Sequence, residues 1–167
     1  MATNPPLPPA DFRIYNHMAD KMKAFHDHFR MQWNVLFAAA NTSTRPMDMS
    51  LRSYLKLCLE FCHGLEIHHR IEKTRLFPLL ATRMSAFRKK SSLIQQHKSI
   101  HKGLDNLEVY AQNCLQGAAD FQWSEVKGIL EQFGPTLWQH LDEEVEELGA
   151  DKLREHWSKE EMLRMPM

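Results

Sequence analysis

Glycine is scarce in this sequence, and no segment shows the regular alternation of apolar and polar residues that is typical of a half-buried β-strand. Only six of the 167 residues are glycine. The chain is nevertheless long enough for one domain with a buried core. The shortage of glycine and the missing alternation together favour an all-α protein.

Cysteine is also rare, and the number of cysteines is odd. The chain has only Cys58, Cys62 and Cys114, which argues against a disulfide framework and favours a reducing compartment. Cys58 and Cys62 lie about one helical turn apart, as the two members of a redox pair could. We interpret them instead as small apolar core residues, because free cysteine is commonly buried.

Net charge and long apolar runs are both absent. Lysine and arginine number 21, and so do aspartate and glutamate, so the chain has no overall basic field that would attract nucleic acid or a membrane surface. No apolar run approaches the ~20 residues of a membrane-spanning helix, and residues 1–10 lack the basic and apolar segments of a signal peptide. We expect a soluble, cytoplasmic protein with no nucleic-acid or membrane partner, and the sequence specifies no oligomeric state.

Helical periodicity, in contrast, is abundant. After a proline-rich arm (residues 1–10), apolar residues recur in steps of three and four near 11–40, 48–78, 93–117 and 124–148. Asp11 can cap the first helix. Pro78 should end or kink the second, because proline lacks an amide donor and clashes with the preceding turn. We expect residues 11–150 to form an antiparallel up-down four-helix bundle, with the charged residues 151–167 as a short C-terminal extension.

Histidine is unusually frequent, with ten residues, and several histidines occur in pairs with a residue four positions on. Side chains four apart share one face of a helix, with Cβ atoms ~5–6 Å apart, so each pair can reach one metal centre or two neighbouring ones. A single pair is weak evidence. Three pairs on three successive helices, each in phase with the apolar seam, indicate a metal site: His68 with Glu72, His97 with His101, and His140 with Glu144.

Charge supports the same interpretation. A buried carboxylate without a partner is costly, so something must neutralise Glu72 and Glu144. Two cations would do so, and imidazoles would supply most of the other ligands. The alternative, in which these histidines only form hydrogen bonds in the core, leaves the two carboxylates without a counter-charge.

The remaining histidines are assigned by their position on each helix. On the first helix we prefer His26, which lies on the apolar stripe, and His28 is the alternative. We exclude His69, because it points ~100° away from its neighbour His68 on a helix. The rest are expected to face solvent or to form local hydrogen bonds: His17, His63 and His156.

Together these residues resemble the hemerythrin-like (HHE cation-binding) domain over roughly residues 11–150. Segment 68–78 (HHRIEKTRLFP) is similar to that family's segment, in which a double histidine precedes a glutamate and a Phe-Pro pair. The resemblance implies two iron ions (Fe2+/Fe3+) with an oxo or hydroxo bridge, and one iron with an open site for a small ligand such as dioxygen. It implies Glu72 and Glu144 as bridging carboxylates, and as terminal ligands His26, His68, His97, His101 and His140.

The predicted set of metal ligands limits the reactions that the site would support. Ferritin-like di-iron proteins carry a Glu-x-x-His motif on each of two helices, whereas both such motifs here fall within one helix, at 60–63 and 66–69. Five neutral imidazoles and two carboxylates donate less negative charge. This favours binding, sensing or modest redox work on dioxygen, peroxide or nitric oxide over forceful oxidation of C–H bonds.

Two further interpretations remain open. One is a di-iron oxidase or oxygenase that acts on a small organic substrate. The other is a structural or partner-binding bundle that a metal such as zinc stabilises.

Oxygen-carrying hemerythrins have a longer His-to-Asp spacing on the last helix than the four positions between His140 and Glu144. The resemblance is therefore to the wider hemerythrin-like group, whose roles are diverse.

Overall fold

The computed structural model describes residues 4–167, and this part of the chain forms helices and no strands. The prediction of an all-α fold is therefore confirmed for these residues. Four long helices are present: α1 (Pro9–Thr42), α2 (Leu51–Ile71), α4 (Ser92–Leu115) and α5 (Trp123–Glu147). There are more helical segments than the four expected, since shorter ones link or follow them: the π-helix η1 (Glu72–Leu76), α3 (Phe77–Leu80), the 3-10 helix η2 (Ser85–Phe87), α6 (Ala150–Leu153) and α7 (Lys159–Met162).

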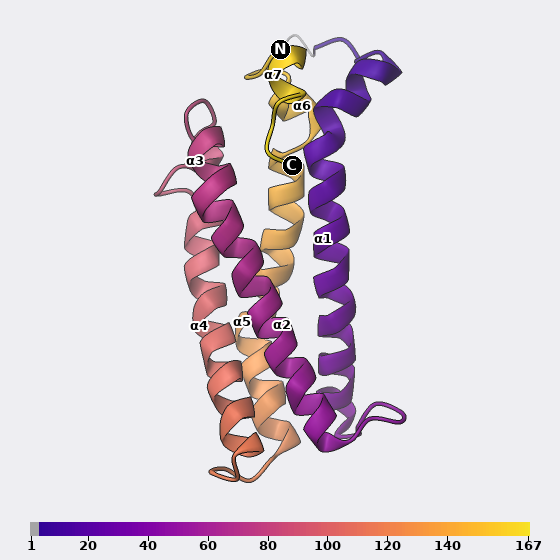
Figure 1. The fold of residues 1–167 in the computed structure, drawn as a ribbon, viewed down its shortest axis with the longest axis vertical. Coiled ribbons are helices and arrows are strands. Elements are labelled where there is room, and N and C mark those ends of the chain that lie inside the picture. Colours follow the sequence, from indigo (N-terminus) through magenta and orange to yellow (C-terminus); the bar gives the residue numbers. More distant parts are fainter. Residues whose placement is uncertain (1–3) are drawn as a thin grey trace.

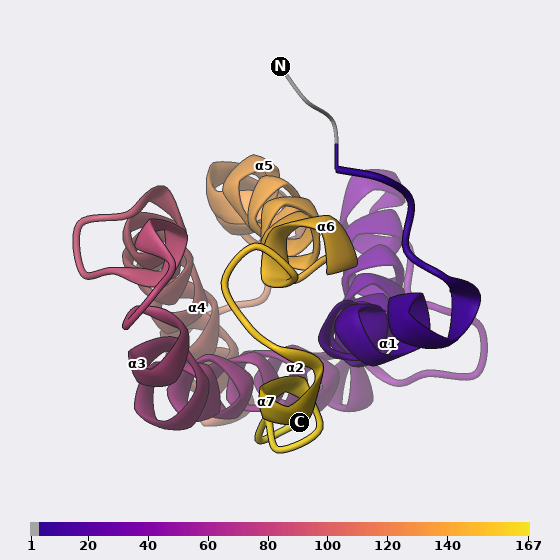
Figure 2. The ribbon, with the colours of Figure 1, turned by 90° about the horizontal axis from the view of Figure 1, so that it is seen from above.

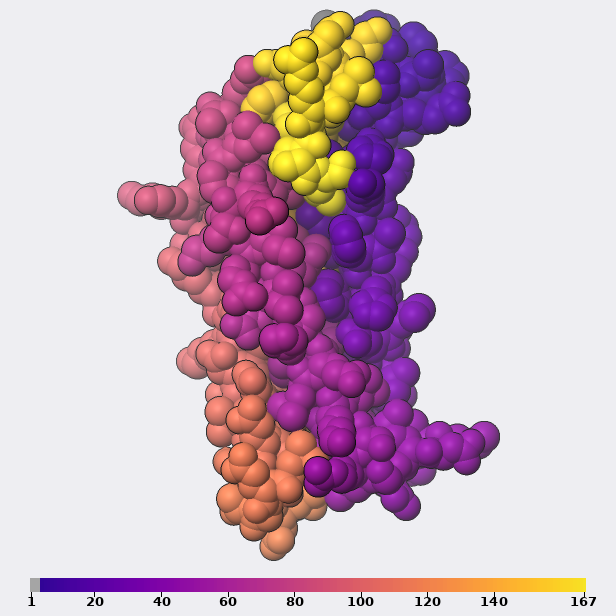
Figure 3. Space-filling model, viewed as in Figure 1, coloured from indigo at the N-terminus to yellow at the C-terminus, as the bar shows by residue number. Residues whose placement is uncertain are grey.

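The long helices lie side by side along the long axis of the molecule (Figure 1), and the view from above shows them around a shared interior (Figure 2). α4 packs against α2 and α5, and α1 packs against the same two helices. The α1–α2 and α4–α5 loops lie at one end of the molecule. The short helices gather at the other end, where the C-terminal segment covers the junction between α1 and α2 (Figure 3).

Serine residues start two of the long helices. The side-chain oxygens of Ser50 and Ser91 accept hydrogen bonds from the backbone amides of Ser53 and Ile94, which satisfies donors that a helix leaves free at its start. The first helix begins differently from the expectation. It starts at Pro9 with Pro8 as its N-cap, so Asp11 lies inside the first turn. Proline is suited to this position, because its fixed φ angle matches a helix and its missing amide is not needed there.

The second predicted helix continues as far as Leu80, past the proline expected to end or kink it. Directly before Pro78 the backbone widens into the π-helical turn η1, in which the amide of Phe77 donates to the carbonyl oxygen of Glu72. Proline clashes with the carbonyl four residues earlier and has no amide to donate. A wider turn relieves this conflict, and π turns of this kind are frequent at functional sites. The predicted kink is thus a local change of helix type that begins at Glu72.

Two glycines allow neighbouring helices to approach closely. A Cβ atom on Gly103 of α4 would overlap the ring of Phe133 on α5, and one on Gly134 of α5 would lie 2.7 Å from Cζ2 of Trp33 on α1. Only a hydrogen fits at either position. The α4–α5 and α1–α5 contacts therefore depend on these glycines.

The apolar core consists of two clusters, one at each end of the long helices. One cluster includes Trp33, Phe61 and Phe133, and the other includes Met22, Phe77 and Trp157. The cysteine interpretation fits the first cluster: Cys58 and Cys62 are buried there and unpaired, and burial raises the pKa of the Cys58 thiol to about 12. None of the helices in residues 4–167 has the length and hydrophobicity that a membrane span requires.

Candidate metal centre

A band of buried titratable side chains separates the two apolar clusters. On α1 and α4 the buried histidine of this band lies between a residue of one cluster and a residue of the other, Met22 and Phe29 on α1 and Leu93 and Ile100 on α4. Six of these side chains are buried, and the side chain of His68 is 12% exposed. The buried six are His26, His69, Glu72, His97, His140 and Glu144. A protein interior seldom holds so many ionisable groups unless they are paired or bind metal.

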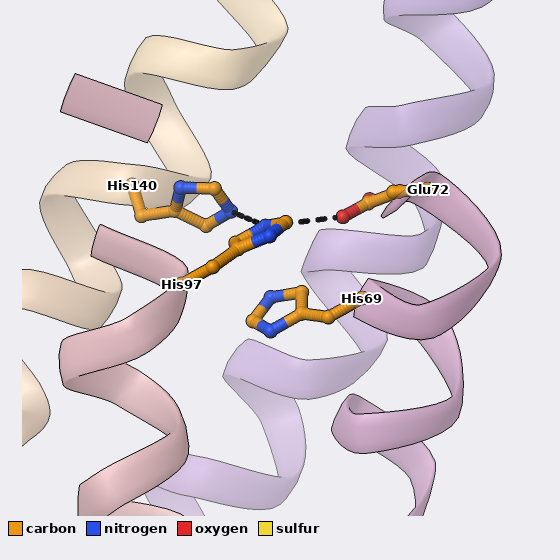
Figure 4. A group of neighbouring side chains, drawn as sticks. All are labelled: His69, Glu72, His97 and His140. Atoms are coloured by element: carbon orange, nitrogen blue, oxygen red, sulfur yellow. Dashed lines mark hydrogen bonds and ion pairs between the residues drawn. The ribbon is translucent and has the colours of Figure 1, made fainter. Parts of the chain in front are cut away.

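The first group consists of His69, Glu72, His97 and His140, which come from α2, η1, α4 and α5 (Figure 4). One ligand atom of each residue lies within 4.8 Å of the others. The rings of His69 and His97 stack with centroids 3.9 Å apart. Nε2 of His97 lies 3.1 Å from Nε2 of His140 and 3.3 Å from Oε2 of Glu72. Three imidazoles and a carboxylate thus surround one point.

The second group consists of His26, His68, Glu72 and Glu144, and its ligand atoms lie equally close together. Nε2 of His26 is 3.2 Å from Oε2 of Glu144. Nε2 of His68 is 2.6 Å from Oε1 of Glu72. Glu72 belongs to both groups and presents a different oxygen to His68 than to His97. The two groups are therefore neighbours that share a carboxylate.

Most of these ligand atoms are close to one another without forming hydrogen bonds. In the described residues, no hydrogen bond satisfies Nε2 of His26 or His68, either ring nitrogen of His69, or any carboxylate oxygen of Glu72 and Glu144. Each unsatisfied buried polar atom costs ~1–3 kcal/mol. Lone pairs that converge on a point without bonding to one another are what cations require, so the donor set fits metal ions.

Two histidines are held with a defined nitrogen facing the centre. Nδ1 of His26 lies 2.9 Å from the carbonyl oxygen of Leu141, to which it donates. Nδ1 of His140 lies 3.0 Å from Oε1 of Gln96, and Nε2 of Gln96 in turn donates to Glu143 over 2.7 Å. These bonds place the ring proton on Nδ1, which leaves Nε2 free as a metal ligand.

Burial also keeps three of the imidazoles neutral by lowering their pKa values. It lowers the pKa of His68 and His97, and it lowers the pKa of His69 much further, helped by the neighbouring imidazoles. A histidine must be neutral to bind a metal, because protonation removes the lone pair. These three side chains are therefore available as ligands at neutral pH.

The two carboxyl groups have opposite pKa shifts. Burial, reinforced by the charge of Glu144, raises the pKa of Glu72 to about 8. Burial acts in the same direction on Glu144, but the close imidazoles of His140 and His26, when they are protonated, outweigh it and lower the pKa. The interior thus accepts one negative charge readily and a second one poorly. A cation between the two groups would favour the ionised form of both.

The structure brings together six of the seven residues singled out from the sequence: His26, His68, Glu72, His97, His140 and Glu144. On α1 it places His26 in the interior, whereas the alternative, His28, is exposed. His101 is half-buried and belongs to neither group, although its ring centroid lies 5.4 Å from that of His69. Its assignment as a ligand stays a prediction.

The sequence reasoning left out His69, which lies in the first group. A helix inside a bundle has two neighbours, and α2 contacts both α1 and α4. Residues ~100° apart on it can each face one of them. His68 lies against Phe25 and Phe29 of α1, and His69 stacks on His97 of α4. The double histidine itself was the available signal.

Comparisons with known proteins agree with this geometry. The family model for the hemerythrin HHE cation binding domain matches residues 17–167. The chain is also 27% identical over 107 residues to the dimeric xanthone biosynthesis cluster protein R11 of Cryptosporiopsis sp. (strain 8999), a match that covers 58% of this chain. It covers only 38% of that relative's length. No solved structure gives a significant match.

Proposed function

Since the chain belongs to the hemerythrin HHE cation-binding domain family, we propose that it is a non-haem di-iron protein that binds dioxygen or a related small ligand. Peroxide and nitric oxide are the related ligands, and the role is binding, sensing or modest redox work. One observation carries the proposal: two groups of ligand atoms share Glu72, and most of these atoms lack hydrogen-bond partners. The proposal includes the antiparallel up-down topology for the four long helices.

The donor set supports two ions. Each group offers four residues, and only Glu72 is common to both. Nitrogen and oxygen donors of this kind suit iron, and two carboxylates offset part of the charge of two cations. Bound iron would supply a reducible centre with affinity for small oxygen- and nitrogen-containing ligands. The chain's own residues hold the ions, and the apolar clusters on either side exclude water.

A second candidate is a di-iron oxidase or oxygenase that acts on a small organic molecule. An apolar cavity beside His68 favours it, because a binder of diatomic ligands does not need so large a space. The relative named for a dimeric xanthone biosynthesis cluster is consistent with this candidate. The third candidate is a bundle that a metal such as zinc only stabilises.

Metal analysis of protein purified without chelator tests the proposal, and we expect about two irons per chain. One zinc or no metal would favour the structural bundle. Adding dioxygen to the reduced protein should give a visible absorption band. A lasting band indicates a binder, whereas a band that decays only when an organic substrate is added indicates the enzyme.

A pair of variants tests whether metal binding depends on the shared carboxylate. Glu72→Gln should lose most of the iron, because the amide cannot supply two anionic oxygens to neighbouring ions. Glu66→Gln is the matched control, since Glu66 is exposed on the preceding helix α2. Full iron content in Glu72→Gln would contradict the proposed site.

A further inference from the structure

A cavity of about 350 Å³ opens beside the candidate metal centre. It lies between α1, α2 and η1, with Pro166 and Met167 of the C-terminal segment at its edge. Figure 3 shows this side of the molecule, where the C-terminal residues cover the junction of α1 and α2. The volume is at the lower end of the ~300–1,000 Å³ that is usual for ligand pockets. A small organic molecule fits such a space.

His68 and Glu72 connect the cavity to the metal centre, since both line it. Of the seven side chains in the two groups, His68 alone is partly exposed to solvent. Its ring lies close to those of Phe25 and Phe29, with centroid distances of 5.6 Å and 5.2 Å. Its Nε2 atom points to Glu72. A molecule in the cavity would therefore contact the imidazole ring of a candidate iron ligand.

The cavity wall is apolar and partly open to solvent. Phe25 and Ile71 are each 52% exposed, and Ile67 lines the cavity beside them. Exposed aromatic and aliphatic side chains gathered around a hollow are typical of ligand sites. Tilted aromatic rings such as those of Phe25, His68 and Phe29 pack well against the face or edge of another ring. The wall therefore suits an aromatic molecule.

The two ends of the cavity carry different ionisable side chains. Glu72 lies at the buried end, and Arg75, one helical turn further along the chain, is exposed at the mouth. In residues 4–167, no carboxylate forms an ion pair with Arg75. The guanidinium of Arg75 would therefore attract a negative group to the mouth. An occupant should therefore place its ring against His68 and its anionic group near Arg75.

We propose that this cavity binds a small aromatic carboxylate or phenolate, with the ring against His68 and the anionic group at Arg75. The inference deepens the proposed function, on which it rests only for the role of His68 as an iron ligand. It names the class of organic molecule that reaches the site.

The probe is 2-naphthoate, titrated by its fluorescence into the full chain, both as isolated with metal and after removal of metal by a chelator. Gly64 lines the cavity, and a Cβ atom there meets only Cε1 of Phe29, at the ordinary contact distance of 3.5 Å. Gly64→Leu should fill the cavity and weaken binding at least about tenfold. Gly128→Leu is the matched control, since Gly128 is also inside a long helix and has open space around it.

A second pair of variants tests the mouth and does not depend on filling the interior. Arg75→Glu should weaken 2-naphthoate binding about threefold to tenfold, because an attraction becomes a repulsion. Lys73→Glu makes the same charge change at an exposed position of η1 that does not line the cavity, and it should bind like the wild type. Circular dichroism checks that all four variants are folded.

The outcomes separate this inference from the proposed function. If 2-naphthoate does not bind the wild type, or binds Gly64→Leu and Arg75→Glu as tightly as their controls, the cavity proposal is overturned, whatever the metal content. If it binds as expected to protein that never contains iron, the cavity proposal stands and the di-iron function fails. If both hold, adding 2-naphthoate to the iron-loaded chain should also shift its visible spectrum, through contact with His68.

Discussion

The Nε2 atoms of His97 and His140 lie 3.1 Å apart, although the two residues belong to different helices. Because Nδ1 of His140 donates to Gln96, Nε2 of His140 carries a lone pair that points at His97. Two such nitrogens need a proton or a cation between them. A metal ion at this point would replace that proton, so the close approach of α4 and α5 shapes the candidate metal centre.

The first prediction concerns Gln96, which holds His140 without itself facing the centre. Gln96→Leu should lower metal affinity about 10- to 100-fold, because the ring of His140 would lose the bond that fixes its tautomer. Competition with a chelator of known affinity measures the change. Gln95→Leu is the control, since Gln95 is an exposed neighbour on α4. Equal affinities of the two variants would mean that Gln96 does not position His140.

A second prediction separates the two histidines on which sequence and structure differ. His69→Gln should reduce the metal content from about two ions per chain to about one, because His69 belongs to the first group. His101→Gln should keep nearly all of its metal, as should His63→Gln, whose side chain is exposed on α2. Elemental analysis of the three purified variants provides the measurement. Loss of metal from His101→Gln alone would instead support the sequence-based ligand assignment.

The third prediction uses two glycines inside helices. Gly103→Ala should destabilise the protein by about 1–3 kcal/mol, because the added methyl group would overlap the ring of Phe133. Gly128→Ala should stabilise it by about 0.4–1 kcal/mol, because that position has open space and alanine restricts the unfolded chain. Urea unfolding of the metal-free proteins measures both. An unchanged Gly103→Ala would show that α4 and α5 do not approach as described, and a destabilised Gly128→Ala would show that the space around Gly128 is filled.

The fourth prediction concerns pH and the end of the bundle. Arg83 donates two hydrogen bonds to Glu161 and holds the pKa of that carboxyl at about 2. Since the folded-state pKa is depressed, the stabilisation is fully present above the usual pKa of glutamate, ~4.3, and is lost as the pH falls towards 2. The difference in melting temperature between wild type and Glu161→Gln should therefore be largest above pH 5 and shrink below pH 4. Thermal unfolding of metal-free protein from pH 6 to pH 3 measures it, and a constant difference would contradict the ion pair.

Residues near the ends of helices show how far sequence patterns reach. The fourth helix was expected at 124–148 and is found at Trp123–Glu147. The first begins at Pro9, two residues before Asp11, because proline itself suits the first turn. The local sequence predicts reliably that a helix forms. It predicts the first residue of the helix less reliably, since several neighbouring residues can serve as the N-cap.

The sequence by itself determined that the chain is helical and that His26, His68, Glu72, His97, His140 and Glu144 lie in phase with apolar seams. A helix has a fixed angle between successive residues, so spacing gives the direction of each side chain around its own axis. Only the tertiary structure decided that α2 faces two neighbours, which places His68 in one group and His69 in the other and leaves His101 half-buried outside both. It also decided that a π turn begins at Glu72, whose two oxygens face different histidines. The physical reason is that contacts between helices depend on how the helices pack against one another. The angular position of a residue on its own helix does not specify this packing.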